Sequence, residues 1–210
     1  VNTGEGDLYE IDSALRPNGN AGLLVTSFTS YANYQQQRGC NSAWTWEHQA
    51  LTRARYCCGD VAVGEHFAEI RENVLAAERD RARLRADVLE MRQKMHDGHP
   101  NHSGLFDLKH DQGGLVDVEF AVQYLVLSQS AAHPELLANA GNIALLERAE
   151  QLGLLPAGIG HAGANAYRSL RQVQHHARLN EESTVLDASA LAQERQAILN
   201  LWHSVFRSPN

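Results

Sequence analysis

The sequence predicts a mainly α-helical protein with a small β part at its start, an α+β fold. Apolar and polar residues alternate from Tyr9 to Asp12, which is the period of a strand. Beyond about residue 61, apolar residues recur every three to four positions, which is the period of helices with one buried face. Gly59-Asp60 separates the two patterns. We therefore expect a first part over residues 1–60 and a helical domain over residues 61–210.

The first expected element is a hairpin over residues 8–25. Its first strand places Asp12 on the polar face, opposite Tyr9 and Ile11. Pro17-Asn18-Gly19 has the composition of a turn, because Pro fixes φ and Asn and Gly tolerate positive φ. Leu23–Val25 would form the second strand. Asp12 and Arg16 beside one groove would suit a metal-bound phosphate, whereas an amphipathic hairpin with solvated charges is the simpler explanation and is favoured by the local pattern alone.

The remaining elements follow from helical periodicity and its interruptions. Thr26-Ser27 is suited to cap the first helix, and Asp187 or Ser189 the last. Expected helices cover residues 28–37, 43–55, 61–77, 79–95, 115–128, 142–152, 163–179 and 189–206. A short extended piece is expected at 106–109. The part after residue 60 would thus be a bundle of about six helices.

A second distinctive stretch runs from Lys109 to Phe120. Gly113-Gly114 leads into a helix, and the free backbone N–H groups at such a point favour an anion, with Lys109 adding positive charge. Asp117 and Glu119 are two positions apart, so they point about 200° apart and cannot hold one metal together. The alternative is structural: Asp111 caps the turn, and Asp117 stabilises the first helical turn.

Three weaker patterns have simple structural explanations. His96, His99 and His102 have a metal-like spacing, but Gly98 and Pro100 place them in a loop, where a solvated segment is expected. Trp44 and Trp46 are expected to anchor the core. Arg53 and Arg55 would either reach a phosphate or pair with carboxylates of the helical part. These last two alternatives stay open on sequence grounds.

Composition limits the classes of protein to which this chain can belong. With 210 residues and 43% hydrophobic residues, the chain holds enough apolar surface to bury a core. Its net charge of −7 is wrong for binding nucleic acid through overall charge, so no nucleic acid partner is expected. No apolar run reaches the ~20 residues that span a membrane, so no membrane-spanning segment and no membrane partner are expected. Three cysteines without a C-x-x-C pair are typical of the reducing cytoplasm.

Three runs of residues carry a family resemblance. They are Leu8-Tyr9-Glu10-Ile11-Asp12 with Leu15-Arg16-Pro17, then Trp44-Thr45-Trp46-Glu47-His48-Gln49 with Arg53, and Lys109-x-Asp111-x-Gly113-Gly114-x-x-Asp117-Val118-Glu119-Phe120. Together they resemble the glutamine synthetase adenylyltransferases, which are bifunctional adenylyltransferase/deadenylylase enzymes. The Trp-Thr-Trp-Glu-His-Gln run is most similar to their C-terminal, adenylylating half.

The resemblance implies the last strands of a nucleotidyltransferase palm of the DNA polymerase β type over residues 1–60, followed by a helical domain. Asp12 matches the third of three catalytic carboxylates that hold Mg²⁺, and Arg16 and Lys109 would contact ATP. The implied reaction is attack of a glutamine synthetase tyrosine hydroxyl on the α-phosphorus of ATP. Glutamine synthetase and the PII signalling protein are the implied partners.

Two departures from the family pattern qualify the expectation. The Asp-x-Asp motif of the other two carboxylates is absent, and the chain begins at Val1 without Met, so we expect a piece of a longer protein that is inactive by itself. Ala14 stands where the family has Arg. An alternative is a non-catalytic helical module that docks glutamine synthetase or PII. A related uridylyltransferase is a third possibility, which the Trp-Thr-Trp-Glu-His-Gln run argues against.

Overall fold

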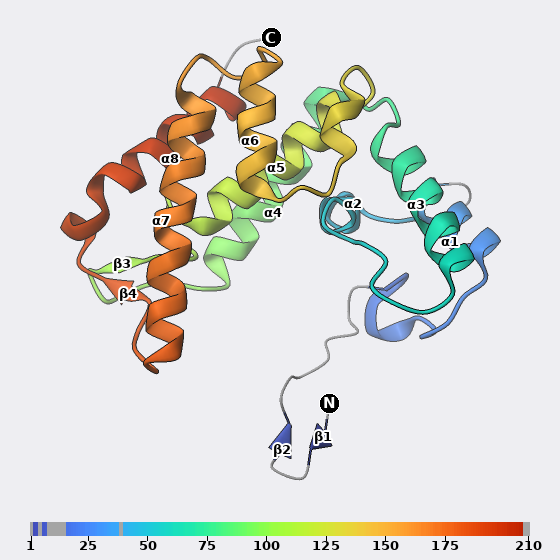
Figure 1. Ribbon diagram of the computed structural model, residues 1–210, viewed down its shortest axis with the longest axis horizontal. Coiled ribbons are helices and arrows are strands. Elements are labelled where there is room, and N and C mark those ends of the chain that lie inside the picture. The colour runs from blue at the N-terminus through green and yellow to red at the C-terminus, as the bar shows by residue number, and fades with distance from the viewer. Residues whose placement is uncertain (1, 4–5, 8–15, 38–39, 208–210) are drawn as a thin grey trace.

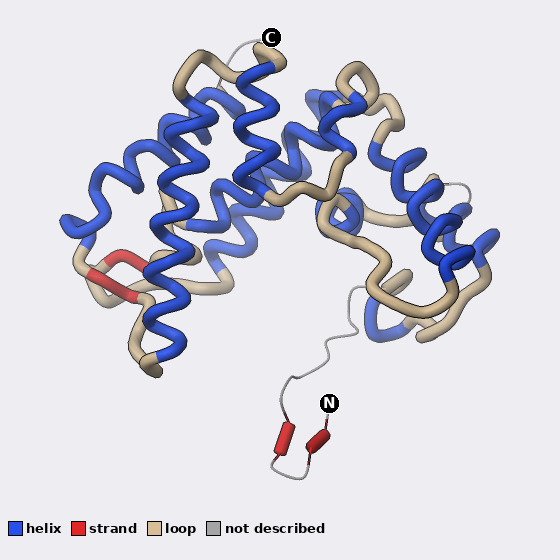
Figure 2. Tube along the Cα trace, viewed as in Figure 1, coloured by secondary structure: helices blue, strands red, loops and turns tan. Residues whose placement is uncertain are grey.

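The computed structural model describes residues 2–3, 6–7, 16–37 and 40–207, and it is mostly helical (Figures 1 and 2). The helices are α1 (Phe28–Gln35), α2 (Thr45–Leu51), α3 (Val61–Leu75), α4 (Arg81–Asp97), α5 (Leu115–Gln129), α6 (Asn142–Gln151), α7 (Ile159–Leu179) and α8 (Ala192–Phe206). Four two-residue strands form two antiparallel pairs: β1 (Asn2–Thr3) with β2 (Gly6–Asp7), and β3 (Phe106–Asp107) with β4 (Val185–Leu186). The expected α+β class is confirmed.

Three helices begin at side chains that accept the free N–H groups of the first turn. Ser27 accepts from Ser30 at the start of α1. Asp60 does so for α3, and Asp80 for α4. Asp187 caps a short 3-10 helix, Ala188–Leu191, that leads into α8. Local sequence therefore sets the starts of these three helices, as the expected cap at Ser27 illustrates.

Helix α5 forms the centre of the fold. It is buried on almost all sides, and α4, α6, α7 and α8 each pack against it. The core continues into the first part of the chain through Leu51 of α2, which belongs to the same apolar cluster as Val74 and Val88. Helix α2 packs against α3, α4 and α5. The proposed division at residue 60 is thus crossed by a shared core.

The second strand of the expected hairpin is absent, which corrects the prediction. The turn itself is present: Gly19 donates to the Arg16 carbonyl at 2.8 Å, and Asn18 and Gly19 have φ of 63° and 54°. Leu23–Val25 is not a strand, and its side chains are 75–83% exposed. No strand among the described residues pairs with it, and a lone hairpin gains too little burial to be stable. The expected first strand lies outside the described residues.

Helix α7 begins at Ile159, about one turn earlier than predicted. The helix contains Gly160, although glycine is a poor helix former. The structure shows why glycine is required: a Cβ at Gly160 would lie 2.6 Å from the Leu146 carbonyl oxygen. The close approach of α6 and α7 therefore depends on this position. Among the described residues, no helix is long and apolar enough to cross a membrane.

Candidate functional site

A cavity of about 300 Å³ lies beside the Arg16 turn, between that turn, α1 and α2. Its lining includes two arginines, Arg16 and Arg53, together with Tyr31 and Glu47. Arg16 donates from Nε to the Gly22 carbonyl at 3.1 Å, which holds its guanidinium at the turn. The sequence singled out Arg16 and Arg53 separately. The tertiary structure brings them to one cavity, and paired guanidinium groups are suited to phosphate.

Glu47 is the buried acceptor of this region. Its side chain is 8% exposed, and both carboxylate oxygens lie 2.9 Å from the Tyr34 hydroxyl. One of them also accepts from the Trp44 backbone N–H at 2.8 Å. Burial, reinforced by the charge of Glu47, raises the pKa of Tyr31 to about 12. The carboxylate is thereby committed to holding α1 against the start of α2.

The Trp44–Arg53 segment makes tertiary hydrogen bonds to helices far along the chain. Thr45 donates to Asp87 of α4 at 2.6 Å. Gln49 donates to Gln123 of α5 at 2.9 Å. Arg53 donates to Asn142 of α6 at 3.0 Å rather than pairing with a carboxylate. The residues that carry the family resemblance thus fasten the first part of the chain to the bundle.

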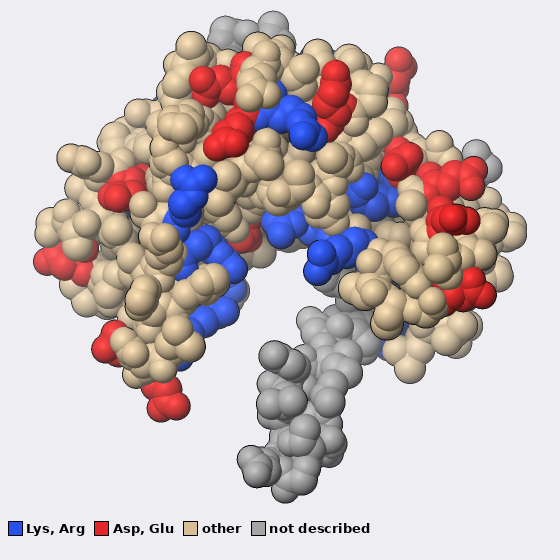
Figure 3. Space-filling model, in the orientation of Figure 1, with Lys and Arg blue, Asp and Glu red and all other residues tan. Residues whose placement is uncertain are grey.

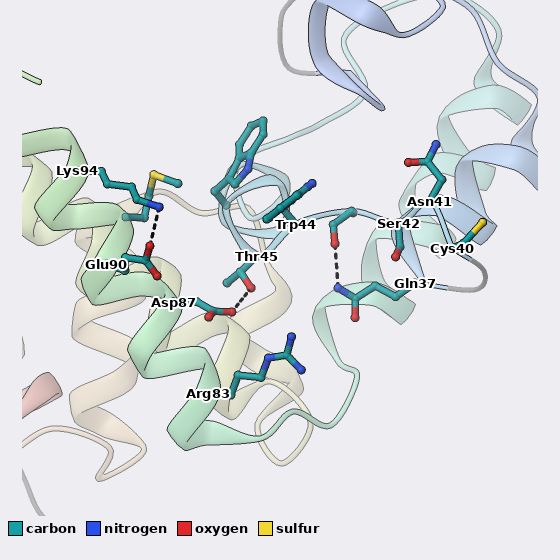
Figure 4. A pocket seen from close by; sticks show the side chains of 13 residues that line it. Gln37, Cys40, Asn41, Ser42, Trp44, Thr45, Arg83, Asp87, Glu90 and Lys94 are labelled. Carbon is teal, nitrogen blue, oxygen red and sulfur yellow. Dashed lines mark hydrogen bonds and ion pairs between the residues drawn. The ribbon is translucent and has the colours of Figure 1, made fainter.

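Trp44 is 70% exposed, so the expectation that it anchors the core is wrong. As the N-cap of α2 it has extended backbone, with φ −82° and ψ 160°, and it precedes the face that the helix buries. Its indole borders a groove of about 500 Å³ whose other wall is α4, with Arg83, Asp87 and Glu90 (Figure 4). Trp46 lines the same groove and is half-buried.

The segment Lys109–Asp117, a loop followed by the first residues of α5, is held by hydrogen bonds to its own carboxylates. Asp117 accepts from Arg92 of α4 at 2.6 Å and from the Gly113 N–H at 2.7 Å. Asp111 accepts from the Asp107 N–H and from the Asn101 amide, each at 2.8 Å. The carboxylate of Asp117 occupies the anion position that the Gly-Gly turn was expected to offer. For Asp111 and Asp117 the structural alternative therefore holds.

Asp117 and Glu119 diverge as the helical spacing predicted. While Asp117 contacts Arg92 on α4, Glu119 accepts a hydrogen bond from Tyr167 on α7 at 3.1 Å. The two carboxylates serve different neighbours. They cannot share one metal ion.

Lys109 has an exposed side chain and lies two residues after the end of β3. It does not line the cavity that Arg16 and Arg53 share. The structure therefore does not unite the two residues that the resemblance assigns to ATP. On the face seen in Figure 3, Lys and Arg side chains gather along the walls of a hollow, and Asp and Glu lie mostly on the outer surface.

Asp12, the expected catalytic and Mg²⁺-binding residue, lies outside the described residues. Within the described ranges, no group of three His, Cys, Asp or Glu side chains is arranged to hold a metal ion. His99 stacks on His110, with ring centroids 4.0 Å apart, instead of joining His96 and His102. The described side chains by themselves therefore do not form a Mg²⁺ site.

Comparison with known proteins identifies the family. A model described as glutamate-ammonia ligase adenylyltransferase matches residues 1–70, and one described as GlnD PII-uridylyltransferase matches residues 81–197, more than half of the chain. A protein of Burkholderia mallei named bifunctional glutamine synthetase adenylyltransferase/adenylyl-removing enzyme is 50% identical over 97% of the chain. The chain belongs to the glutamine synthetase adenylyltransferase family. Identically named proteins of Bordetella bronchiseptica and Nitrosomonas europaea are 49% and 46% identical.

The chain spans only a fraction of these family members. It covers 22% of the Burkholderia and Bordetella proteins and 23% of the Nitrosomonas protein, so it corresponds to a fragment of them. The match to the uridylyltransferase model falls on the helical part, α4 to α8, which is therefore a domain type found with nucleotidyltransferases. The three relatives are named for adenylyl transfer and removal.

Proposed function

We propose that the chain is part of an adenylyltransferase that transfers AMP from ATP to a tyrosine of glutamine synthetase, and so regulates nitrogen assimilation in the cytoplasm. The observation that carries the proposal is about 50% identity along 97% of the chain to enzymes named for this activity. Residues 1–60 would supply the end of the palm, and residues 61–210 the helical domain of the C-terminal, adenylylating half.

Asp12 is the proposed catalytic and Mg²⁺-binding carboxylate, acting with two carboxylates from elsewhere in the full-length protein. Arg16 is the proposed phosphate contact, and its sharing of a cavity with Arg53 supports this role. Lys109 is the second proposed ATP contact, although it does not line that cavity. Because one carboxylate cannot hold two Mg²⁺ ions, the 210-residue chain alone would be inactive.

The test is incorporation of labelled AMP from ATP into glutamine synthetase by the full-length protein, with Mg²⁺ present. We expect Asp12→Ala to lower the rate at least about 100-fold, because a lost metal ligand removes stabilisation that water cannot replace. Asp97→Ala, an exposed aspartate at the end of α4, is the matched control and should leave the rate unchanged. Normal labelling by the Asp12→Ala protein would refute the assignment.

A docking module that binds glutamine synthetase or PII is the second candidate. The observation in its favour is the basic hollow of Figure 3, in a chain whose net charge is −7. In a pull-down, the 210-residue chain would retain one of these proteins at low salt and release it as salt screens the charges. Retention of neither protein would exclude this function.

A further inference from the structure

A cavity of about 260 Å³ lies behind the Gly113-Gly114 turn, where α4 meets the start of α5 and the end of α8. Its lining includes Arg92, His96, Asp117, Trp202, His203 and Arg207. The α4 and α8 residues among them are more than 100 positions apart in the chain, and none of the six lines the Arg16 cavity. The volume lies at the lower end of ligand pockets, which suits a small molecule.

The negative charge in this lining is already neutralised. Asp117 is 4% exposed, and its two carboxylate oxygens accept from Arg92 Nε and from the Gly113 N–H. Among the described residues that line the cavity, Asp117 is the one with a carboxylate. A cation entering the cavity would therefore compete with a buried arginine for it.

The arginines of the lining, in contrast, have guanidinium N–H donors without an acceptor among the described residues. Arg92 uses Nε for Asp117 and Nη2 for the His110 carbonyl, at 2.9 Å, while Nη1 has no acceptor among the described residues. Arg207 caps the end of α8 with its backbone, and its guanidinium likewise has no acceptor within residues 40–207. Two arginines thus face one neutralised carboxylate, which leaves an excess of positive charge.

His96 adds a further hydrogen-bond donor. Its Nδ1 is enclosed and has no hydrogen-bond partner in the described part of the chain. An enclosed N–H without an acceptor is costly, so the ring proton is favoured on Nε2. The ring then offers Nε2–H as its donor, beside the imidazole of His203 and the indole of Trp202.

We propose that this cavity is a binding site for a small oxyanion, a carboxylate or a phosphate, held between α4, the 110–114 loop and the end of α8. The surplus donors of Arg92 and Arg207 would pair with its oxygens through charge-assisted hydrogen bonds. Such a ligand would link the Lys109–Asp117 loop to the last helix. It would stabilise the bundle without touching the cavity that contains Arg16.

Hydrogen-exchange mass spectrometry of the full-length protein tests the site, at constant ionic strength. The probes are inorganic phosphate and, separately, malonate. Saturable protection of peptides covering residues 110–117 and 196–207 is expected with at least one probe. Protection by phosphate alone would identify the ligand as a phosphate, and protection by malonate alone would identify it as a carboxylate. Protection by both probes would show that the site accepts either oxyanion.

The test variant is Arg207→Gln with His203→Gln, and the matched control is Arg178→Gln with His175→Gln at the exposed end of α7. We expect the Kd of the effective probe to rise about tenfold or more in the test variant and to stay unchanged in the control, as loss of a charged partner requires. The proposal is overturned if neither probe gives saturable protection below about 20 mM, a concentration that corresponds to very weak binding. Equal protection in both variants would overturn it as well.

Discussion

Helix α4 carries two ion pairs with the same N–O distance, 2.6 Å, and opposite exposure. The side chains of Arg92 and Asp117 are 7% and 5% exposed, and those of Lys94 and Glu90 are both 65% exposed. Water screens the second pair, whereas removal of one partner of the first leaves a buried charge without compensation. At the scale of single residues, environment rather than geometry decides what each pair contributes.

Asp117→Ala should therefore lower the free energy of unfolding by about 3–5 kcal/mol. It removes the carboxylate that accepts from Arg92 and from the Gly113 N–H, and so leaves a buried charge without a partner. Glu90→Ala, which breaks the exposed pair, should change it by less than about 1 kcal/mol. Urea unfolding followed by circular dichroism measures both. Similar losses in the two variants would contradict the role given to burial.

His48 gives the protein a calculable pH dependence. Burial, followed by the charge of Arg79, lowers the pKa of His48 to about 4. In the unfolded chain the pKa of a histidine is about 6.5. Between pH 4 and pH 6.5 the unfolded chain therefore binds a proton at His48 that the folded chain does not bind. Stability is therefore complete above about pH 6.5 and falls as the pH drops toward 4, by roughly 3 kcal/mol in all.

His48→Gln should remove this part of the pH dependence. Comparing urea midpoints at pH 7 and pH 5 should show a smaller acid-induced loss in the variant than in the parent protein. His176→Gln, an exposed histidine of α7, serves as the control and should keep the parental slope. A parental slope in the His48→Gln protein would disprove the assignment.

At the scale of elements, α2 shows how a short helix depends on its neighbours. It has seven residues, too few for a stable isolated helix. Glu47 caps its start, and Thr45 and Gln49 attach it to α4 and α5. Its end is held by Arg71 of α3, which donates to the Leu51 and Thr52 carbonyls at 3.1 and 2.7 Å.

Arg71→Met should destabilise the protein by about 3 kcal/mol, since charged hydrogen bonds to two helix-end carbonyls are lost in a buried place. Arg71→Lys should restore little, because an ammonium cannot reproduce the planar set of guanidinium donors. Arg83→Met on the exposed face of α4 is the control. Thermal unfolding of the three variants measures these differences in stability. Full stability of the Arg71→Lys protein would contradict the role given to the planar guanidinium donors.

At the scale of the whole molecule, the described parts of residues 1–60 and 61–210 share one core. Leu51 packs within the cluster that includes Val74, Val88 and Leu127. Hydrogen bonds from Thr45, Gln49 and Arg53 cross the same boundary. Two family models match separate parts of the chain, residues 1–70 and 81–197, whereas packing joins these parts through one core.

Calorimetry of the 210-residue chain should accordingly show one unfolding transition, with equal calorimetric and van't Hoff enthalpies. Exposing Leu51 by unfolding the first part would open the core of the second. The Gln49→Ala protein, which lacks the bond to Gln123, should keep a single transition at lower temperature. Two separated transitions in the parent protein would instead favour independent folding on either side of residue 60.

Sequence by itself determined the local features of this protein. Helical period gave the helices, Ser27 gave the start of α1, and Asn18 and Gly19 gave the turn, because these properties depend on neighbours a few positions away. The divergence of Asp117 and Glu119 followed from helix geometry alone. The resemblance of the Trp44–Arg53 run also gave the family, although not the structural work of its residues.

Tertiary structure alone decided which side chains meet. Arg92 and Asp117 are 25 positions apart, and Gln49 and Gln123 are 74 apart, so no local pattern encodes these contacts. The same holds for the cavity that Arg16 and Arg53 share. Leu23–Val25 and Trp44 were misjudged because apolar character signals burial only when a partner surface is present. A sequence states each residue's chemistry, but only packing supplies the partner and the dielectric that determine its role.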